Sequence, residues 1–339
     1  MTYRIAILGM GKIGRKRHDI IQSMNTMDIA GSWDPYDTSS NDRYGSAEDV
    51  FNDASVDAVF ICTTNNLLKD LTIQALQAGK HVFCEKPPAF TAAEVDDIQK
   101  AERESGRILM YGFNHRQHGA VKKMKSIADS GDYGKILWMR GRYGKSVDED
   151  FFSTWRADKD LAGGGILLDQ GIHMLDLFLH LGGSFDQVKA FISTLYWNLE
   201  GIEDNVFAVM KNSETGLVAS LHSTMTQWRH LFSLEVFMES GYMVLNGLRT
   251  SSQTYGEEVL TVARNRTKAP AATWEDEERF VYDVDTSMDQ EVHLFYDAMA
   301  AGQRPSSGNS DDARNVMMLV DAIYENGIDT QNGTRTSLM

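Results

Sequence analysis

The feature that most constrains the fold is a glycine pattern near the start of the chain. The sequence G-M-G-K-I-G at residues 9–14 follows directly on a short apolar run, residues 5–8. Glycines at this spacing permit a tight turn, let the backbone approach a pyrophosphate closely, and let the following helix pack on the strand. The pattern therefore predicts a strand–turn–helix unit that binds a dinucleotide. Its predicted contacts come from Gly9, Gly11, Lys12, Ile13 and Gly14.

An acidic residue, Asp34, ends the next predicted strand at the spacing expected for a ribose ligand. Its carboxylate would accept hydrogen bonds from the adenosine ribose hydroxyls and would repel a 2′-phosphate. This favours NAD over NADP as the cofactor. Arg43 lies nearby in the sequence and could pair with a 2′-phosphate, so NADP remains possible.

Strand-like and helix-like stretches alternate through the first part of the chain, which is typical of a parallel sheet covered on both faces. The expected strands are residues 4–8, 29–33, 57–62, 81–84 and 108–112, and the clearest helices are residues 13–24 and 91–105. Thr91 with Glu94 three residues later predicts a capping box at the second of these helices. We therefore expect an α/β fold that begins with a doubly wound Rossmann domain over residues 1–120.

The pattern changes after about residue 133, where short strands follow one another with short turns. They are expected at 135–143, 187–194, 206–210, 217–223, 231–238 and 242–245, with helices at 166–181, 288–301 and 311–324. This predicts an α+β domain over residues 121–339 with an open, mainly antiparallel sheet. An open sheet face needs cover, so we expect a homodimer or homotetramer.

Charge and composition narrow the partners and the compartment. The formal net charge is −15 and the isoelectric point is near 5.0. Such a field repels phosphate backbones and anionic lipids, so neither nucleic acid nor membrane is an expected partner. Two cysteines are too few for a disulfide framework, and no apolar stretch reaches the length of a membrane span. We expect a cytoplasmic protein.

A lysine that follows a parallel strand is the first candidate for chemistry. Lys86 stands in the sequence C-E-K-P-P at residues 84–88, where ligands bind in open α/β sheets. Its ammonium group could hydrogen-bond a substrate hydroxyl and the nicotinamide ribose, and it would stabilise a developing alkoxide. The alternative is a solvated lysine in a proline turn.

The second candidate segment is a predicted helix that follows the glycines at 163–165. Asp169 and His173 are four residues apart, so both would lie on one helix face. Oxidation of an alcohol needs a base near neutral pKa, which histidine supplies, and Asp169 could bind the substrate or orient the imidazole. Asp176 is a second candidate for that orienting role. The alternatives are a buried structural histidine or a zinc pair, but no third ligand is evident and we predict no metal.

A third group of polar residues could line a substrate cleft. It consists of Asn114 and Arg116 in the run Y-G-F-N-H-R, and Trp155 and Arg156 just before the glycines. These side chains could contact substrate hydroxyls or a charged substituent. The alternative for each is an ordinary polar contact between domains.

Together these motifs resemble the glucose-fructose oxidoreductase / inositol dehydrogenase / rhizopine-catabolism (Gfo/Idh/MocA) family over nearly the whole chain. The E-K-P sequence and the D-x-G-x-H-x-x-D sequence, in that order, are the most specific. The resemblance implies that Lys86, Asp169 and His173 form the catalytic set, with the histidine as acid/base, and that these three also bind substrate. It further implies that Thr63 and Asn65 line the cofactor crevice, that Glu85 and Lys86 contact the cofactor, and that the open sheet serves oligomerisation.

The function expected from these residues is an NAD-dependent dehydrogenase that acts on CH–OH groups. It would transfer a hydride between nicotinamide and a secondary alcohol or ketone of a sugar, an inositol or a nucleotide sugar. This expectation requires the Lys86 ammonium and the His173 imidazole, from separate domains, to meet beside a bound nicotinamide. Two alternatives are an NAD-assisted glycosidase and a non-catalytic sensor of NAD or a metabolite. A sensor would have lost the catalytic set, which this chain retains.

Overall fold

The computed structural model describes residues 2–34 and 43–329, with the side chain of residue 329 left out. The chain forms two compact units, each discontinuous in sequence. The N-terminal unit comprises Met1–Asn114, Asp160–Gly163 and Met288–Met318, and the C-terminal unit comprises His115–Lys159, Gly164–Ser287 and Leu319–Met339. The division into domains 1–120 and 121–339 that the sequence suggested stays a prediction.

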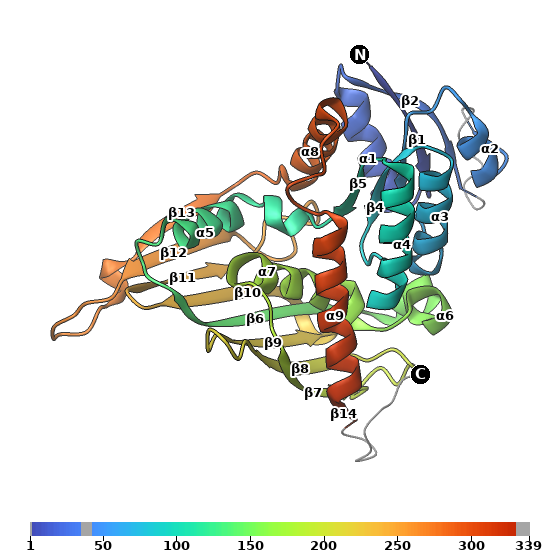
Figure 1. Ribbon diagram of the computed structural model, residues 1–339. Helices are drawn as coiled ribbons and strands as arrows, with labels where there is room; N and C mark the ends of the chain where they lie inside the picture. Colours follow the sequence, from blue (N-terminus) through green and yellow to red (C-terminus); the bar gives the residue numbers. More distant parts are fainter. Residues whose placement is uncertain (1, 35–42, 330–339) are drawn as a thin grey trace. The chain divides into compact units, whose positions relative to one another are not determined.

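The N-terminal unit is built on a parallel sheet of five strands in the order β2-β1-β3-β4-β5 (Figure 1). The strands are β1 (Tyr3–Leu8), β2 (Met27–Trp33), β3 (Ala58–Ile61), β4 (His81–Glu85) and β5 (Leu109–Gly112). All neighbours pair in parallel, as predicted for a Rossmann fold. The strand order reverses between β1 and β3, and in such sheets ligands bind outside the carboxyl ends of the strands at that point.

Helices cover both faces of this sheet. They are α1 (Lys12–Ser23), α2 (Ala47–Asn52), α3 (Asn65–Gln77), α4 (Ala92–Ser105), α8 (Ser287–Ala301) and the first part of α9 (Ser310–Asn326). On one face, α1 and α8 pack on alternate strand residues that include Ile5 and Phe60. The rings of Phe60 and Phe83 stack at 4.8 Å, and Phe295 of α8 meets both rings edge-on. Helix α8 is therefore part of this core despite its distance along the chain.

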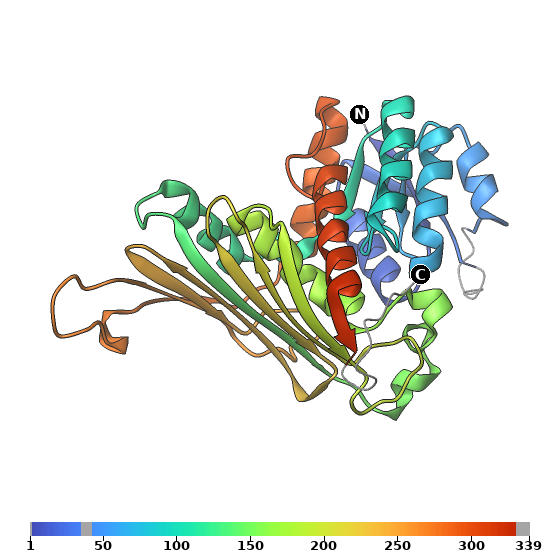
Figure 2. The same cartoon turned by 60° about the horizontal axis from the view of Figure 1, so that its bottom comes forward.

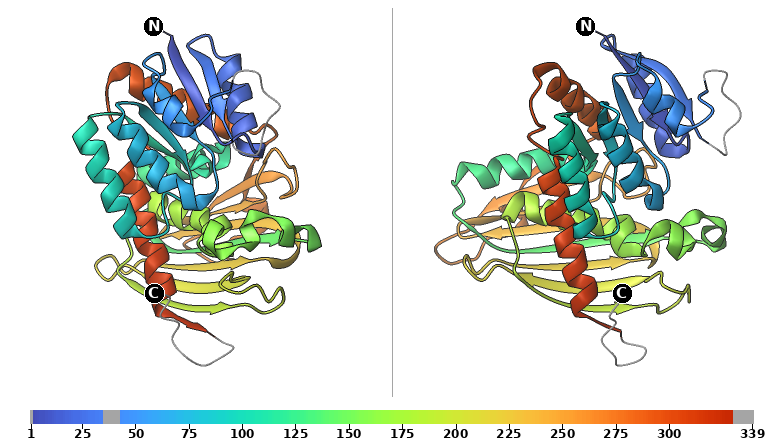
Figure 3. Two further views of the ribbon diagram at one scale, coloured as in Figure 1. Left: turned by 90° about the vertical axis from the view of Figure 1, so that its right-hand side faces the viewer. Right: turned by 45° about the vertical axis from the view of Figure 1, so that its right-hand side comes forward.

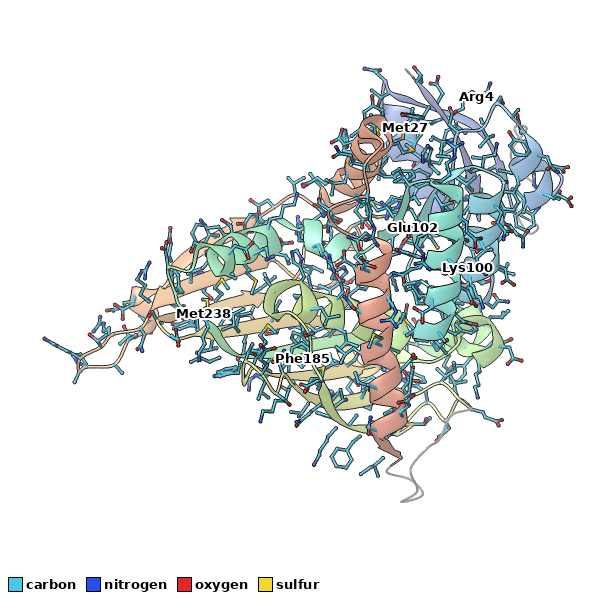
Figure 4. The ribbon with its side chains drawn as sticks, viewed as in Figure 1. Arg4, Met27, Lys100, Glu102, Phe185 and Met238 are labelled. Carbon is cyan, nitrogen blue, oxygen red and sulfur yellow. The ribbon has the colours of Figure 1, made fainter. Side chains whose placement is uncertain are left out.

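The start of α4 shows half of the predicted capping box. The Thr91 hydroxyl accepts a hydrogen bond from the Glu94 backbone N–H at 3.2 Å. The Glu94 carboxylate instead accepts from the Phe90 backbone N–H at 2.8 Å, one residue earlier than the box requires. At the other end of α4, Glu102 faces α9, where the Ser310 hydroxyl donates to its carboxylate (Figure 4). Burial raises the pKa of Glu102.

The C-terminal unit contains a mixed sheet of nine strands in the order β13-β12-β11-β10-β6-β9-β8-β7-β14. The strands are β6 (Ile136–Ser146), β7 (Gln187–Ser193), β8 (Asn205–Lys211), β9 (Val218–Thr224), β10 (Thr226–Met238), β11 (Gly241–Asn246), β12 (Glu258–Arg264), β13 (Glu278–Tyr282) and β14 (Gly327–Asp329). Strands β7–β9 and β10–β13 form two meanders, and β6 is inserted between them. Strand β6 is antiparallel to β10 but parallel to β9. The mainly antiparallel sheet is as predicted, whereas strands β12 to β14 were not.

Two helices, α5 (Gly119–Ser130) and α7 (Ile172–Gly182), cover one face of this sheet (Figures 2 and 3). The packing of α7 is close, because a Cβ atom on Gly141 of β6 would lie 2.4 Å from the Met174 sulfur. The opposite face carries exposed apolar side chains, with Phe191 and Phe207 paired across β7 and β8 and each more than half exposed. This is the open sheet face that the sequence predicted.

Short helical elements carry several of the candidate site residues. They are three 3₁₀ turns (Asn114–Gln117, Glu149–Ser153 and Trp155–Ala157), helix α6 (Lys159–Ala162) and a π-helical turn (Leu167–Gly171). Within the described residues, no helix combines the length and apolar character that crossing a membrane requires.

Candidate functional site

The glycine loop between β1 and α1 has the geometry that its sequence predicts. Gly9 has a φ of +91°, and a Cβ atom there would lie 2.6 Å from the Cys62 carbonyl oxygen. A Cβ atom on Gly14 would lie 1.8 Å from the Gly9 carbonyl oxygen, so both positions require glycine. Gly11 differs, because no heavy atom lies within 4 Å of the place its Cβ would take. It precedes the first turn of α1, where backbone N–H groups favour an anion. This loop fits the pyrophosphate of a dinucleotide.

Asp34 ties the end of β2 to the glycine loop. One carboxylate oxygen accepts a hydrogen bond from the Met10 backbone N–H at 2.7 Å. The Arg43 guanidinium donates to the backbone carbonyl of Asp34, so a cation and an anion lie at the same strand end. The carboxylate is in the position expected for a ribose ligand, and Arg43 is held close to it.

The end of β4 is anchored by an arginine that the sequence did not single out. Arg17 of α1 is 1% exposed, and it donates to Glu85 at 2.9 Å and to Glu291 of α8 at 2.6 Å. Its guanidinium also lies 4.5 Å from the centre of the Phe83 ring. Burial lowers the pKa of Arg17, but the two carboxylates outweigh burial and raise it, so it is always charged. Arg17 thereby orients Glu85, the residue before Lys86.

The predicted cofactor residues of the N-terminal unit gather at the carboxyl edge of its sheet. Thr63 follows β3, and Asn65 is the first residue of α3. The Asn65 side chain donates to the Ala162 carbonyl at 2.9 Å, which holds helix α6 beside the start of α3. The glycine loop, Asp34, Thr63, Asn65, Glu85 and Lys86 therefore lie at the ends of β1, β2, β3 and β4, which are neighbouring strands.

In the C-terminal unit, Asp169 is at the centre of a charged cluster. One of its oxygens accepts from the Lys145 ammonium at 2.7 Å, and the other faces the Arg156 guanidinium at 3.3 Å. Arg156 also lies 4.3 Å from the centre of the Trp155 ring. We refer to Asp169, Lys145 and Arg156 as the Asp169 cluster. Lys145, on β6, was not predicted from the sequence.

Asp169 lies in a π-helical turn and not in the regular α-helix that the sequence predicted. The turn leads directly into α7, which carries His173. A π turn has more residues per turn than an α-helix, so it changes the direction of Asp169 relative to His173. Such turns occur often at functional sites.

A buried glutamate holds the start of this turn. The Glu203 carboxylate accepts from the backbone N–H groups of Gly165 and Leu167 at 2.7 and 2.9 Å. A Cβ atom on Gly165 would lie 2.1 Å from the Glu203 carbonyl oxygen, so this glycine permits a close approach of two backbone segments. Burial raises the pKa of Glu203, although the N–H donors oppose that shift. Glu203 was also missed from the sequence, although it stands beside a second buried acid, Asp204.

His173 is buried in a row of aromatic side chains. Its ring stacks on that of His115, with centroids 3.9 Å apart and an interplanar angle of 19°. The His115 Nε2 atom lies 2.9 Å from the Tyr143 hydroxyl, and Tyr143 is hydrogen-bonded to Tyr255. Burial raises the pKa of Tyr143 well above its ordinary value, so its hydroxyl is neutral. The row fixes the plane of the His173 ring.

Arg116 and Asp176 form a buried ion pair with two hydrogen bonds, of 2.8 and 2.6 Å. The two side chains are 5% and 1% exposed. The pair joins the Asn114–Gln117 turn to α7 and so supports the helix that carries His173. Substrate binding by Arg116 and orientation of His173 by Asp176, as suggested by the sequence, stay predictions.

Two other placements complete the predicted set. Asn114 is the last residue of the first segment of the N-terminal unit, and Trp155 begins a 3₁₀ turn of the C-terminal unit. Within the described part of the chain, no group of three His, Cys, Asp or Glu side chains could hold a metal ion.

Comparison with known families decides the relationship. Residues 3–113 match the profile described as an oxidoreductase family with an NAD-binding Rossmann fold. Residues 121–244 match the profile of the GFO/IDH/MocA C-terminal domain. The chain belongs to the Gfo/Idh/MocA family. The family resemblance seen in the motifs is therefore confirmed, together with the oxidoreductase class and the NAD-binding fold.

Individual relatives are named as dehydrogenases or reductases of sugars. A levoglucosan dehydrogenase from Pseudarthrobacter phenanthrenivorans is 36% identical over 43% of this chain and 38% of its own length. A 1,5-anhydro-D-fructose reductase from Ensifer adhaerens is 27% identical over 89% of this chain and 87% of its own length. Several of the relatives are matched over about half their length or less.

The fold is shared with a solved structure described as levoglucosan dehydrogenase in complex with NADH. The two align with a TM-score of 0.84 and 23% identity over 96% of this chain and 97% of the other. At this identity the likeness establishes the fold of Gfo/Idh/MocA proteins for this chain.

Proposed function

We propose that this Gfo/Idh/MocA protein is an NAD-dependent dehydrogenase that interconverts a secondary alcohol and a ketone on a sugar or polyol. The observation that carries the proposal is the joint placement of Asp169 and His173. They lie on a π turn and the α-helix that continues it, with one side chain in a charged cluster and the other in an aromatic row. The sugar dehydrogenases and reductases among the relatives support the same class of substrate.

The chemistry divides between cofactor and protein. A bound nicotinamide would supply the hydride acceptor for oxidation of the carbinol carbon, or the hydride donor in the reverse direction. His173 takes the hydroxyl proton as the C–H bond breaks, so that alcohol and NAD⁺ give ketone, NADH and a proton. Asp169 positions a substrate hydroxyl with help from Lys145 and Arg156. The Lys86 ammonium stabilises the negative charge that develops on the alcohol oxygen.

We further propose that the cofactor is NAD and not NADP. The Asp34 carboxylate lies at the end of β2 beside the glycine loop, where it would repel a 2′-phosphate. The Arg43 side chain donates to the Asp34 carbonyl, so its guanidinium is engaged at the end of β2.

The open face of the nine-stranded sheet suggests self-association. We propose that a second copy covers this face, which presents Phe191, Phe207 and Val209 at half exposure or more. A paired Arg140 and Glu235 on the same face would add polar contacts between copies.

The first test is a panel of sugars, inositols and nucleotide sugars, with NADH formation read by absorbance. The proposal expects turnover with at least one secondary alcohol. In His173→Ala, NAD binding should persist while kcat falls about a hundredfold or more. An unchanged kcat in this variant would remove the acid/base role of His173.

The same panel separates the alternatives. An NAD-assisted glycosidase would cleave aryl glycosides without net NADH production. A sensor would bind NAD or a sugar and turn over neither.

A further inference from the structure

Four aromatic side chains from three segments meet on the surface of the C-terminal unit. Phe152 belongs to the Glu149–Ser153 turn, Tyr196 and Trp197 follow β7, and Trp228 lies near the start of β10. Their rings meet edge to face, with centroid distances of 5.0 Å for Tyr196–Trp228, 5.0 Å for Tyr196–Trp197 and 5.7 Å for Phe152–Trp197. We call these four residues the aromatic platform.

The platform is exposed to an unusual degree. Phe152, Tyr196 and Trp228 are 45%, 56% and 63% exposed. Contact between apolar rings and water is unfavourable, so covering clustered aromatic rings with a ligand lowers the free energy. Such patches therefore commonly mark binding sites.

The platform is also held rigidly. The Asp204 carboxylate is fully buried and accepts backbone N–H groups from Leu195, Tyr196 and Trp197 at 2.8 to 3.0 Å. The Trp197 indole N–H donates to the Met225 carbonyl at 3.1 Å. A loop fixed in this way loses little conformational entropy when a ligand binds. Asp204 is therefore best understood as the residue that preorganises the platform.

The chain connects this platform directly to the Asp169 cluster. Phe151, the neighbour of Phe152, has its ring centre 5.3 Å from the Lys145 ammonium, and Lys145 pairs with Asp169. On the other side, Thr226 lies two residues before Trp228 and pairs with Ser146, the neighbour of Lys145. The platform therefore borders the residues proposed to hold the reacting sugar.

We propose that the aromatic platform binds a second sugar ring, glycosidically linked to the ring that is oxidised. The preferred substrate is then a glycoside or oligosaccharide and not a free monosaccharide. This inference rests on the proposed dehydrogenase function and adds a subsite to it.

The chemistry of a sugar ring matches the platform. The C–H groups of a pyranose carry partial positive charge and pack on the electron-rich face of an aromatic ring. Because the platform rings are tilted by 64° to 82° to one another, they present faces in different directions and not one flat apolar surface. A flat partner surface would fit the open sheet face better than these tilted rings.

The test compares a disaccharide with the methyl glycoside of its oxidised unit, for the wild type and for Trp228→Ala. Removal of the indole should lower kcat/KM for the disaccharide about tenfold, the effect of about 1.4 kcal/mol, while kcat/KM for the methyl glycoside changes less than about twofold. Leu195→Ala is the matched control, because Leu195 is exposed in the same loop but belongs to no ring contact. It should leave both substrates unchanged.

A binding measurement separates this inference from the proposed function. The indole N–H signal of Trp228, assigned by its loss in Trp228→Ala, should shift on titration with the disaccharide and not with the methyl glycoside. A shift without any NADH formation would leave the subsite standing and refute the dehydrogenase. Equal effects on both substrates, or none, would overturn the subsite. Loss of the oligomer in Trp228→Ala would overturn it as well, and would assign the platform to contacts between copies.

Discussion

His115 and His173 lie face to face, with ring centroids 3.9 Å apart and an interplanar angle of 19°. The stack restricts rotation of the His173 ring and so holds its imidazole in one plane. The Tyr143 ring lies 5.5 Å from the His115 ring and 6.3 Å from the His173 ring, and the His118 ring lies 5.6 Å from the His115 ring. His115 is therefore a positioning residue for the proposed acid/base.

We predict that His115→Ala lowers kcat about tenfold, because His173 loses the ring that fixes its plane. His115→Phe restores an aromatic stack, so it should recover part of the kcat that His115→Ala loses. The measurement is kcat for both variants, with NAD affinity as the control. An unchanged kcat in His115→Ala, or no recovery in His115→Phe, would contradict the role.

The Asp34 carboxylate should set the choice of cofactor. Asp34→Ser removes the charge that repels a 2′-phosphate and leaves Arg43 in place. We expect the ratio of kcat/KM for NAD to that for NADP to fall about tenfold or more. A ratio that does not move would show that other residues select the cofactor.

Glu102 predicts a pH dependence of stability. Burial raises the pKa of its carboxyl above the ordinary value of 4.5 in the folded state. The folded protein therefore holds this proton more tightly than the unfolded chain, and its contribution to stability falls as pH rises from about 4.5 through the folded-state pKa. Glu102→Gln keeps an acceptor for the Ser310 hydroxyl but cannot ionise.

We expect the free energy of unfolding of Glu102→Gln, measured in urea, to increase relative to that of the wild type as pH rises through this window. The difference between the two proteins should be constant well below pH 4.5. If the free energy of unfolding of Glu102→Gln instead fell relative to that of the wild type as pH rises, the direction of the pKa shift would be contradicted.

The open sheet face should hold the oligomer together. Phe207→Glu places a charge on this face, where Phe207 stacks on His222 at 3.9 Å. Light scattering after gel filtration should show a monomer for this variant and an oligomer for the wild type. Met318→Glu, a matched change at a 48% exposed position on α9, should leave the oligomer intact. A monomeric wild type would contradict the proposal.

The sequence was most informative where a local pattern determines the structure. The continuous apolar run at 58–62 predicted a buried strand, and the spacing of the glycines at 9, 11 and 14 predicted the tight turn found there. The amphipathic stretch at 166–181 was recognisable as helix, but its π turn was not. A spacing of four residues between Asp169 and His173 is compatible with either geometry.

Residues that act through distant contacts could not be predicted. Arg17 meets Glu291 from 274 positions away, and Lys145 reaches Asp169 from another element. Neither stands in a recognisable motif. Strand β12 was overlooked because it begins with Glu258, whose carboxylate is buried against His118. The consecutive acids Glu203 and Asp204, two residues after Gly201, were a signal that could have been used.

The packing of α8 has a practical consequence for anyone who shortens this protein. A fragment that stops before residue 288 would lack Glu291 and Phe295, leaving Arg17 with one carboxylate and the rings of Phe60 and Phe83 open to water. Such a fragment would be prone to aggregate, and its dinucleotide affinity would not represent that of the intact chain. The N-terminal unit can therefore fold completely only after most of the C-terminal unit has been synthesised.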